Sequence, residues 1–215
     1  MCATIVRIEA AGPERRARRL VFDDGHEPRD VSSAVARQLS LQEGLEVDLV
    51  ALEESIGSIE TSLAKARALQ LLGYRERSRS ELFSKLCATG YPAPVADLVV
   101  ARFVEVELVD DFRFAAAFAR SRAAAGYGNR RIARELAAKG ISDELVAEAL
   151  GSLEPPDTEL SRAQAALQGR MPADTVEARK LVRRLVSRGF DLSVAIQAVD
   201  ATGDLRDSDE RSGTP

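Results

Sequence analysis

Residues able to do covalent chemistry are few and scattered along this chain. His26 is the only histidine, and no serine or cysteine signature stands near it, as nucleophilic catalysis would require. The pair Asp110-Asp111 could serve a metal ion or acid–base chemistry, but it precedes a helical pattern that begins near Phe112. Carboxylates at such a position cap free N–H groups and complement the helix dipole. We therefore expect no catalytic residue, no metal site and no enzyme activity.

Cofactor binding has no motif in the sequence either. Neither GxxxxGK[ST] nor GxGxxG occurs, and these are the glycine-rich loops that cradle phosphates. Gly126-Tyr127-Gly128 is rich in glycine only locally, and we interpret it as a turn between helices. Cys2 and Cys87 form neither a disulfide framework nor a zinc motif. We expect no cofactor and a reducing, cytoplasmic setting.

Basic side chains supply the one recurrent chemical pattern. They recur at equivalent positions of successive helical stretches, which suits a phosphate backbone or an acidic protein groove. The candidate partner-binding or DNA-binding residues are Arg75, Arg77, Arg79, Arg130, Arg131, Arg134, Lys139, Arg179, Lys180, Arg183, Arg184 and Arg188. A charged helix face is also commonly just solvated, so both interpretations stay open on the spacing alone. Few aromatic residues accompany these charges, so base stacking is not indicated.

The whole chain has 215 residues, of which 45% are hydrophobic and 5% aromatic, and it has no tryptophan. A core built from Leu, Val, Ile and Ala favours helices. The net charge of −4 is uneven: residues 1–60 carry 7 basic and 12 acidic side chains (net −5), 61–153 carry 14 and 11 (net +3), and 154–215 carry 9 and 11 (net −2). This balance excludes a uniformly basic nucleic-acid coat. No run of 18 apolar residues occurs, so we expect no membrane span.

The N-terminal part of the sequence predicts a small β-containing domain. Short segments rich in β-branched or bulky apolar residues indicate strands at Thr4–Glu9, Arg18–Phe22 and His26–Val31. Ser32 and Ser33 can cap a short helix. The alternation of apolar residues from Leu45 to Leu49 predicts one more extended stretch.

From about Ser58 the pattern is helical, and it repeats three times. Two apolar residues four apart are followed four positions later by glycine and then by another apolar residue, in Leu82-Leu86-Gly90-Tyr91, Ile132-Leu136-Gly140-Ile141 and Leu181-Leu185-Gly189-Phe190. Glycine suits the left-handed cap that ends a helix. Ser78-x-x-Glu81 and Asp174-x-x-Glu177 suit helix starts. Each motif therefore describes one helix that ends at glycine and a second helix that follows. Because a further helical pattern precedes each of these helix pairs, the repeating unit is three helices.

The predicted architecture is mainly α. Tandem three-helix repeats form an elongated curved rod after a small N-terminal α+β domain. The predicted boundaries are 1–57 for the β-containing domain, 58–108, 109–154 and 155–203 for the three repeats, and 204–215 for a disordered acidic tail. Pro155-Pro156 breaks the chain between the second and third repeats.

Three motifs, in order along the chain, resemble the RecX family, bacterial regulatory proteins that act on the RecA recombinase. They are YRERSRSEL from Tyr74, LVDDFRFA from Leu108 and GYGNRRI from Gly126. The likeness covers residues 61–153 strongly and the third repeat more weakly. The N-terminal segment also looks like the β-containing extension of longer family members.

The resemblance implies a non-enzymatic protein with roles in DNA recombination, DNA repair and the SOS response. It implies binding to RecA, as monomers or as filaments on single-stranded DNA, and damping of its ATPase, strand-exchange and co-protease activities by capping the filament or lodging in its groove. Some members also contact DNA. On this interpretation the chain is a monomer whose binding face is lined partly by Arg130, Arg134, Arg183 and Arg184. The residues expected mainly to hold the repeats are Tyr74, Asp111, Phe112, Phe114 and Gly140.

Two other functions stay open on the residues alone. Paired helices with glycine turns loosely resemble helix-turn-helix units, so the chain could be a stand-alone DNA-binding module. It could also be a helical scaffold for an unrelated partner. RecA as the partner follows from the family resemblance and not from composition or spacing.

Overall fold

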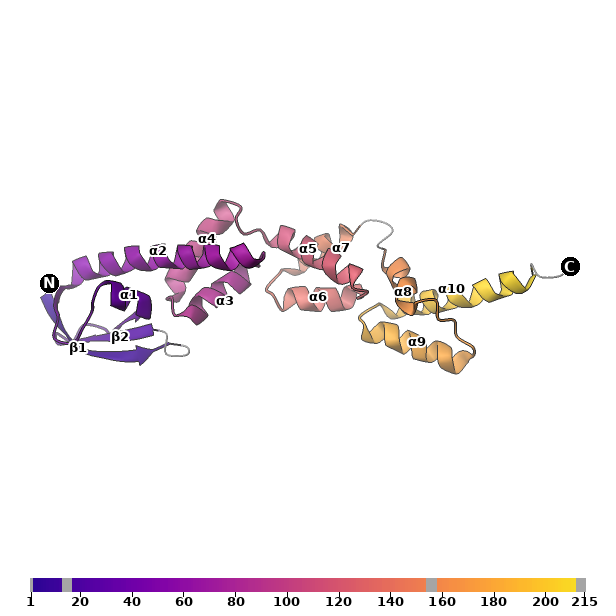
Figure 1. Ribbon diagram of the computed structural model, residues 1–215, viewed down its shortest axis with the longest axis horizontal. Coiled ribbons are helices and arrows are strands. Elements are labelled where there is room, and N and C mark those ends of the chain that lie inside the picture. Colours follow the sequence, from indigo (N-terminus) through magenta and orange to yellow (C-terminus); the bar gives the residue numbers. More distant parts are fainter. Residues whose placement is uncertain (1, 13–16, 154–157, 212–215) are drawn as a thin grey trace. The chain divides into compact units, whose positions relative to one another are not determined.

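The computed structural model describes residues 2–12, 17–153 and 158–211, with the backbone alone for 202–211. The chain forms two compact units, Met1–Asp110 and Asp111–Pro215, and each is described by itself. Figure 1 shows strands only in the first unit, with helices in both. The prediction of a mainly helical protein with a small N-terminal sheet is therefore confirmed. Over the described ranges, no helix combines the length and apolarity needed to cross a lipid bilayer.

An antiparallel sheet opens the first unit, with strand order β3-β2-β1-β4. Its strands are β1 (Cys2–Ala11), β2 (Ala17–Phe22), β3 (Arg29–Ser32) and β4 (Glu46–Asp48). Ile5, Leu20 and Val31 come from three different strands and are fully buried in one core. The third strand begins at Arg29, later than predicted, because Pro28 lacks the N–H that a paired strand position needs.

Helix α1 (Ser33–Gln38) lies between β3 and β4. The helices after β4 are α2 (Leu49–Tyr74), α3 (Arg79–Thr89), α4 (Ala93–Glu105), α5 (Asp111–Ala124), α6 (Asn129–Ala137), α7 (Asp143–Gly151), α8 (Glu159–Leu167), α9 (Thr175–Ser187) and α10 (Leu192–Arg211). Ser32 caps α1 as predicted, because its Oγ accepts the N–H of Val35 at 3.2 Å. The strand expected to reach Leu49 ends at Asp48. That carboxylate accepts the N–H of Val50 at 3.1 Å and so starts α2.

Helix α2 belongs to two hydrophobic cores at once. Near its start, Leu52 and Ile56 pack in the core of the sheet. Further along, Ala64 and Ala68 pack in the core of the first three-helix repeat. Leu63 lies between them and contacts both cores. The predicted start of the helical region near residue 58 is therefore too late, because the helix runs unbroken across the expected boundary between residues 57 and 58.

Among the described residues, Glu60 on α2 is the only buried acidic side chain. Its Oε1 accepts the N–H of Ser32 at 3.1 Å, which ties α2 to the end of β3. Its Oε2 lies 3.8 Å from Nη2 of Arg29, and no described residue donates a hydrogen bond to it. Burial raises the pKa of this carboxyl, and the hydrogen bond from Ser32 and the charge of Arg29 oppose that shift only in part.

Replacing Glu60 with glutamine should change how the stability of the first unit depends on pH. A carboxyl whose pKa is raised by folding stabilises the native state fully below its unfolded pKa, about 4.5, and loses that contribution as the pH rises through the folded pKa. Glutamine does not ionise. As the pH rises above about 4.5, the free energy of unfolding of Glu60→Gln should therefore increase relative to that of the wild type. Urea denaturation across a pH series measures this difference.

The control for this measurement is Glu54→Gln, on the exposed side of the same helix. Its side chain is exposed, so the free energy of unfolding of this variant should stay within about 0.5 kcal/mol of that of the wild type. A Glu60→Gln curve parallel to that of the wild type would contradict the assignment of Glu60 as a buried, destabilising charge.

Each three-helix repeat has its own hydrophobic core. The first core lies between the second half of α2, α3 and α4, the second between α5, α6 and α7, and the third between α8, α9 and α10. The residues that define the sequence repeat are buried in these cores: Leu82, Leu86, Ile132, Leu136, Leu181 and Leu185. The predicted threefold recurrence of a helix triplet is therefore present in the structure.

The predicted helix ends are also observed. The repeat glycines Gly90, Gly140 and Gly189 have φ values of 107°, 78° and 91°, in the left-handed region that a β-carbon disfavours. At the starts of α3 and α9, Ser78 and Asp174 accept backbone N–H groups at 3.1 and 2.7 Å. Local capping chemistry is therefore sufficient to place these helix boundaries.

Helix α10 differs from the prediction for the end of the chain. It extends to Arg211, past residue 204, where the acidic tail was expected to become disordered. No proline or glycine follows Gly203 before Arg211, so a helix started by a packed N-terminal half has no local signal to end it. The rest of the expected tail, 212–215, and the predicted break at Pro155-Pro156 lie outside the described residues.

Candidate functional site

The candidate reactive residues stand on different elements: Cys2 on β1, His26 between β2 and β3, Cys87 on α3 and Asp111 on α5. The Nδ1 atom of His26 lies 3.3 Å from Asp24 on a half-exposed turn. Cys2 and Cys87 are free thiols, and burial raises the pKa of Cys87, which disfavours the reactive thiolate. Asp111 lies inside the first turn of α5 and not before the helix as predicted, in the place where a carboxylate complements the helix dipole. Within the described residues, no group of three His, Cys, Asp or Glu side chains could hold a metal ion.

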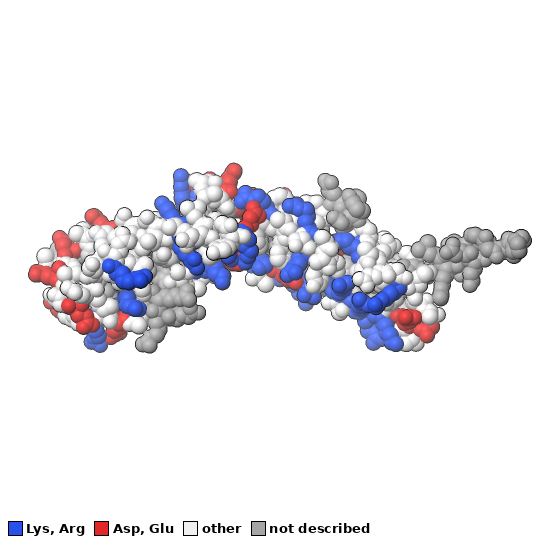
Figure 2. All heavy atoms as spheres, in the orientation of Figure 1, with Lys and Arg blue, Asp and Glu red and all other residues white. Residues whose placement is uncertain are grey.

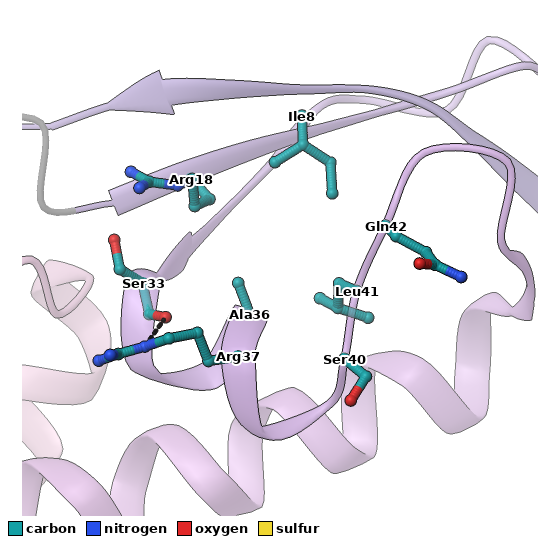
Figure 3. Close-up of a pocket in the computed structure, with 8 residues that line it drawn as sticks. All are labelled: Ile8, Arg18, Ser33, Ala36, Arg37, Ser40, Leu41 and Gln42. Carbon is teal, nitrogen blue, oxygen red and sulfur yellow. Dashed lines mark hydrogen bonds between the residues drawn. The ribbon is translucent and has the colours of Figure 1, made fainter.

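An open pocket of about 640 Å³ lies beside the N-terminal sheet. Figure 3 shows Ile8 pointing toward Ala36 and Leu41, with Arg18 and Arg37 at one end of the pocket. The Nε of Arg37 donates to the carbonyl of Ser33 at 3.3 Å. The lining includes no carboxylate, histidine or cysteine, so this pocket has none of the groups that general acid–base or thiol chemistry would use.

The candidate arginines of the first repeat are held by acidic side chains. Arg77 donates to Glu81 at 2.7 Å and to the carbonyl of Leu71 at 3.1 Å, and its side chain is only 10% exposed. Arg75 pairs with the same carboxylate, and Arg79 lies 3.8 Å from Asp97. The contacts of Arg75 and Arg77 tie the α2–α3 connection together, and they compete with any outside partner for these two arginines.

Two of the four candidates in the second repeat are similarly engaged. Arg131 donates to Glu135 at 2.9 Å and lies 4.3 Å from the ring of Tyr127. Lys139 lies 5.5 Å from the ring of Phe118. Burial of Glu135 opposes its ionisation, but the hydrogen bond and charges of Arg131 and Arg122 outweigh this and lower its pKa. Arg131 and Lys139 therefore stabilise the repeat itself.

Arg130 and Arg134 are the exposed cations of α6. They are four residues apart and share one face of the helix. Neither is in an ion pair with an acidic side chain of the described chain. Arg130 lies near Asp191, whose pKa is lowered mainly by hydrogen bonds from Ser193 and further by this arginine.

Helix α9 carries the densest positive charge. Arg179, Lys180, Arg183 and Arg184 are all exposed, and Figure 2 shows Lys and Arg atoms crowded over this helix. The opposite side of α9 presents the core residues Leu181 and Leu185. Over the described residues none of the four basic side chains forms an ion pair. Arg188, beyond the end of the helix, is half-buried beside Gly126.

The second and third repeats meet through backbone contacts. The N–H of Gly128 donates to the carbonyl of Arg188 at 3.2 Å, and the N–H of Arg130 donates to that of Gly189 at 3.0 Å. A methyl group on Gly128 would overlap the backbone of Gly189 and Phe190. The start of α6 therefore packs directly on the α9–α10 turn, so the helices that carry these exposed cations are joined by backbone hydrogen bonds.

A buried arginine completes this junction. Arg162 on α8 is 6% exposed, and its guanidinium donates to the carbonyl of Tyr127 at 2.8 Å and to Oδ1 of Asn129 at 2.7 Å. Glu159 accepts the N–H of Asn129 at 2.9 Å. Sequence reasoning missed these residues. The one available signal was that Arg162 stands four residues before the buried Ala166, on the same helix face.

Of the residues expected to hold the repeats, some have the expected structural role and Tyr74 does not. Phe114 is 6% exposed in the second core, and Gly140 takes its expected turn conformation. Tyr74 is 84% exposed, so its expected packing role is wrong. It is the last residue of α2, beyond the last buried position of that helix at Leu71.

Comparisons with known proteins match the first two three-helix repeats to a family. Residues 64–103 match the sequence model of the RecX first three-helix domain, and residues 110–150 match that of the RecX second three-helix domain. The regulatory protein RecX of Mycolicibacterium smegmatis is 37% identical over 146 residues, which cover 63% of this chain and 77% of that protein. That of Mycobacterium ulcerans is 37% identical over 145 residues, 64% of this chain and 83% of that protein.

Solved structures share the fold. A crystal structure of regulatory protein RecX aligns with a TM-score of 0.59 at 22% identity, over 91% of this chain and 98% of that chain. The crystal structure of RecX from Lactobacillus salivarius aligns with a TM-score of 0.63 at 19% identity, over 69% of this chain and 99% of that chain. With both three-helix domains matched in order and relatives covered over most of their length, the chain belongs to the RecX family of regulatory proteins.

Proposed function

We propose that this protein regulates the RecA recombinase, mainly as an inhibitor. It binds RecA monomers or RecA filaments on single-stranded DNA and damps ATPase, strand-exchange and co-protease activity. RecA as the partner follows from the resemblance to the RecX family. A regulator of this kind works by occupying a surface, as a monomer in the cytoplasm, and needs no reactive centre or cofactor.

The binding surface proposed is the exposed basic face of α6 and α9. The observation that carries it is the contrast between the two kinds of candidate residue. Arg77 and Arg131 are held by internal carboxylates. The exposed candidates with no ion pair to a described residue are Arg130, Arg134, Arg179, Lys180, Arg183 and Arg184. Unpaired surface charges do little for folding, but they steer and orient an acidic partner.

Reversing four of these charges tests the proposal. The combined variant Arg130→Glu, Arg134→Glu, Arg183→Glu and Arg184→Glu should raise the concentration needed for half-maximal inhibition of RecA ATPase at least about tenfold, because attraction becomes like-charge repulsion. ATP hydrolysis by RecA on single-stranded DNA is followed at substoichiometric amounts of the regulator. Circular dichroism checks that helicity is unchanged.

A matched control carries the same change in net charge at exposed positions outside α6 and α9. It replaces Lys65, Lys85, Arg120 and Arg170 with glutamate. This variant should inhibit RecA like the wild type. Equal inhibition by both variants would remove the basic face of α6 and α9 from the proposed site.

A stand-alone DNA-binding module is the second candidate, since the same basic face could follow a phosphate backbone. It predicts salt-sensitive binding to DNA without RecA, while the leading proposal predicts little binding until RecA is added. The net charge of −4 and the scarcity of aromatic residues favour the protein partner. Anisotropy of a labelled oligonucleotide, with and without RecA, separates the two.

A further inference from the structure

A groove of about 540 Å³ runs between α9 and α10 on the third repeat. Figure 1 shows these two helices side by side, and they pack directly against each other. The groove is lined by Ala178, Arg179, Val182, Arg183, Ile196, Val199 and Asp200. It therefore combines an apolar floor with charged edges.

The floor of the groove is apolar and partly open. Val199 is buried, with 2% of its surface exposed, and Val182 is half-buried against the core of the third repeat. Ile196, one turn before Asp200, is 43% exposed. A half-exposed isoleucine beside a partly covered valine provides a seat for one apolar side chain of a partner.

The α9 edge of the groove is basic. Arg179 and Arg183 stand one helical turn apart, and neither is in an ion pair within the described residues. The Nε of Arg183 donates to the carbonyl of Arg179 at 3.3 Å, which leaves its terminal nitrogens for other acceptors. Asp200 on the α10 edge is the only acidic residue of the lining, so the edge charges favour an acidic segment.

We propose that this groove binds an amphipathic, acidic segment of a partner protein. An apolar side chain of the segment inserts between Val182 and Ile196, and carboxylates spaced by about one turn pair with Arg179 and Arg183. A nucleic acid would not use such a floor, because the lining offers no aromatic ring for a base and phosphates need no apolar seat. The inference rests on the proposed function in one respect, that RecA is the partner used in the first test.

The first test places a charge in the floor. Ile196→Asp, in the full-length chain, should weaken binding to RecA filaments about tenfold or more, because a carboxylate replaces the apolar contact and repels an acidic segment. Ile196 is exposed enough for the variant to fold, which circular dichroism verifies. The matched control is Leu98→Asp on α4, where the side chain is 59% exposed, and it should bind within about twofold of the wild type.

The second test does not depend on RecA. A synthetic helical peptide with Leu on one face and Glu on the other should perturb the NMR amide signals of α9 and α10 in the full-length chain. The same peptide with Lys in place of Glu should not. The perturbation should disappear with Arg179→Glu/Arg183→Glu and with Ile196→Asp.

The outcomes separate the two proposals. If the wild type neither binds nor inhibits RecA, the proposed function fails, and the peptide alone decides the groove. If the acidic peptide leaves α9 and α10 unperturbed, or if the Lys peptide binds equally well, the groove inference is overturned. Loss of binding to RecA filaments in Ile196→Asp, with Leu98→Asp binding like the wild type, supports the groove as the binding site for a RecA segment. Filament binding by Ile196→Asp equal to that of the wild type would overturn it.

Discussion

Gly128→Ala is expected to lower the free energy of unfolding of the second unit by about 3 kcal/mol, the upper range for overpacking. The added methyl group would overlap the backbone of Gly189 and Phe190, which has no rotamer through which to yield. Gly128 itself has φ −81° and ψ 161°, a conformation open to any residue. The whole effect should therefore come from the contact between the second and third repeats. Urea denaturation followed by circular dichroism measures it.

Two comparisons make the Gly128 measurement specific. Gly151→Ala, at the end of α7, meets no atom within 4 Å and should leave stability unchanged or raise it by up to about 1 kcal/mol. Gly189 is a poorer probe, because at φ +91° any β-carbon is strained whatever the packing. If Gly128→Ala unfolded like the wild type, the two repeats would not be seated on one another as described.

Arg162→Ala should be nearly as damaging, with a loss of about 3 kcal/mol, in the range for hydrogen bonds made by a buried charged group. The change leaves the carbonyl of Tyr127 and Oδ1 of Asn129 without their donor. Arg162→Lys should recover only part of the loss, because an ammonium group cannot span the two acceptors as the planar guanidinium does.

A double-mutant cycle identifies the partner in this network. If Arg162 acts through Asn129, then Asn129→Ala and Arg162→Ala together should cost less than the sum of the two single changes, by about 1 kcal/mol or more. The exposed Arg170→Ala serves as the control and should change stability by less than about 0.5 kcal/mol. Strict additivity of the two changes would show that Arg162 and Asn129 are not coupled.

The repeats could be predicted because their signals are local. Apolar residues four apart and a glycine four positions later describe one helix and its end, and the capping residues Ser78 and Asp174 are read from adjacent positions. The continuity of α2 was missed because apolar residues near Leu49 alternate like a strand, whereas Asp48 caps a helix there. Short apolar runs support either structure until their partners in the fold are known.

The state of each basic residue could not be predicted from spacing. Arg130 and Arg131 are neighbours, but only Arg131 is within reach of Glu135, one turn along the same helix. Arg162 looks like an ordinary surface arginine in the sequence, and its burial depends on acceptors more than 30 residues earlier in the chain. Contacts between distant segments decide which charges serve the fold and which remain for a partner.

The 26 residues of α2 connect the N-terminal sheet to the first repeat through one continuous helix. At about 1.5 Å per residue the helix is about 39 Å long, and its two ends are clamped by different cores. The sheet is therefore not joined to the first repeat by a flexible linker, and it cannot reorient independently while α3 and α4 stay packed on α2. A molecule that binds the sheet and shifts it would therefore also move the first repeat. Proteolysis near Gly57 would cut α2 and destabilise the core of the sheet and the core of the first repeat together.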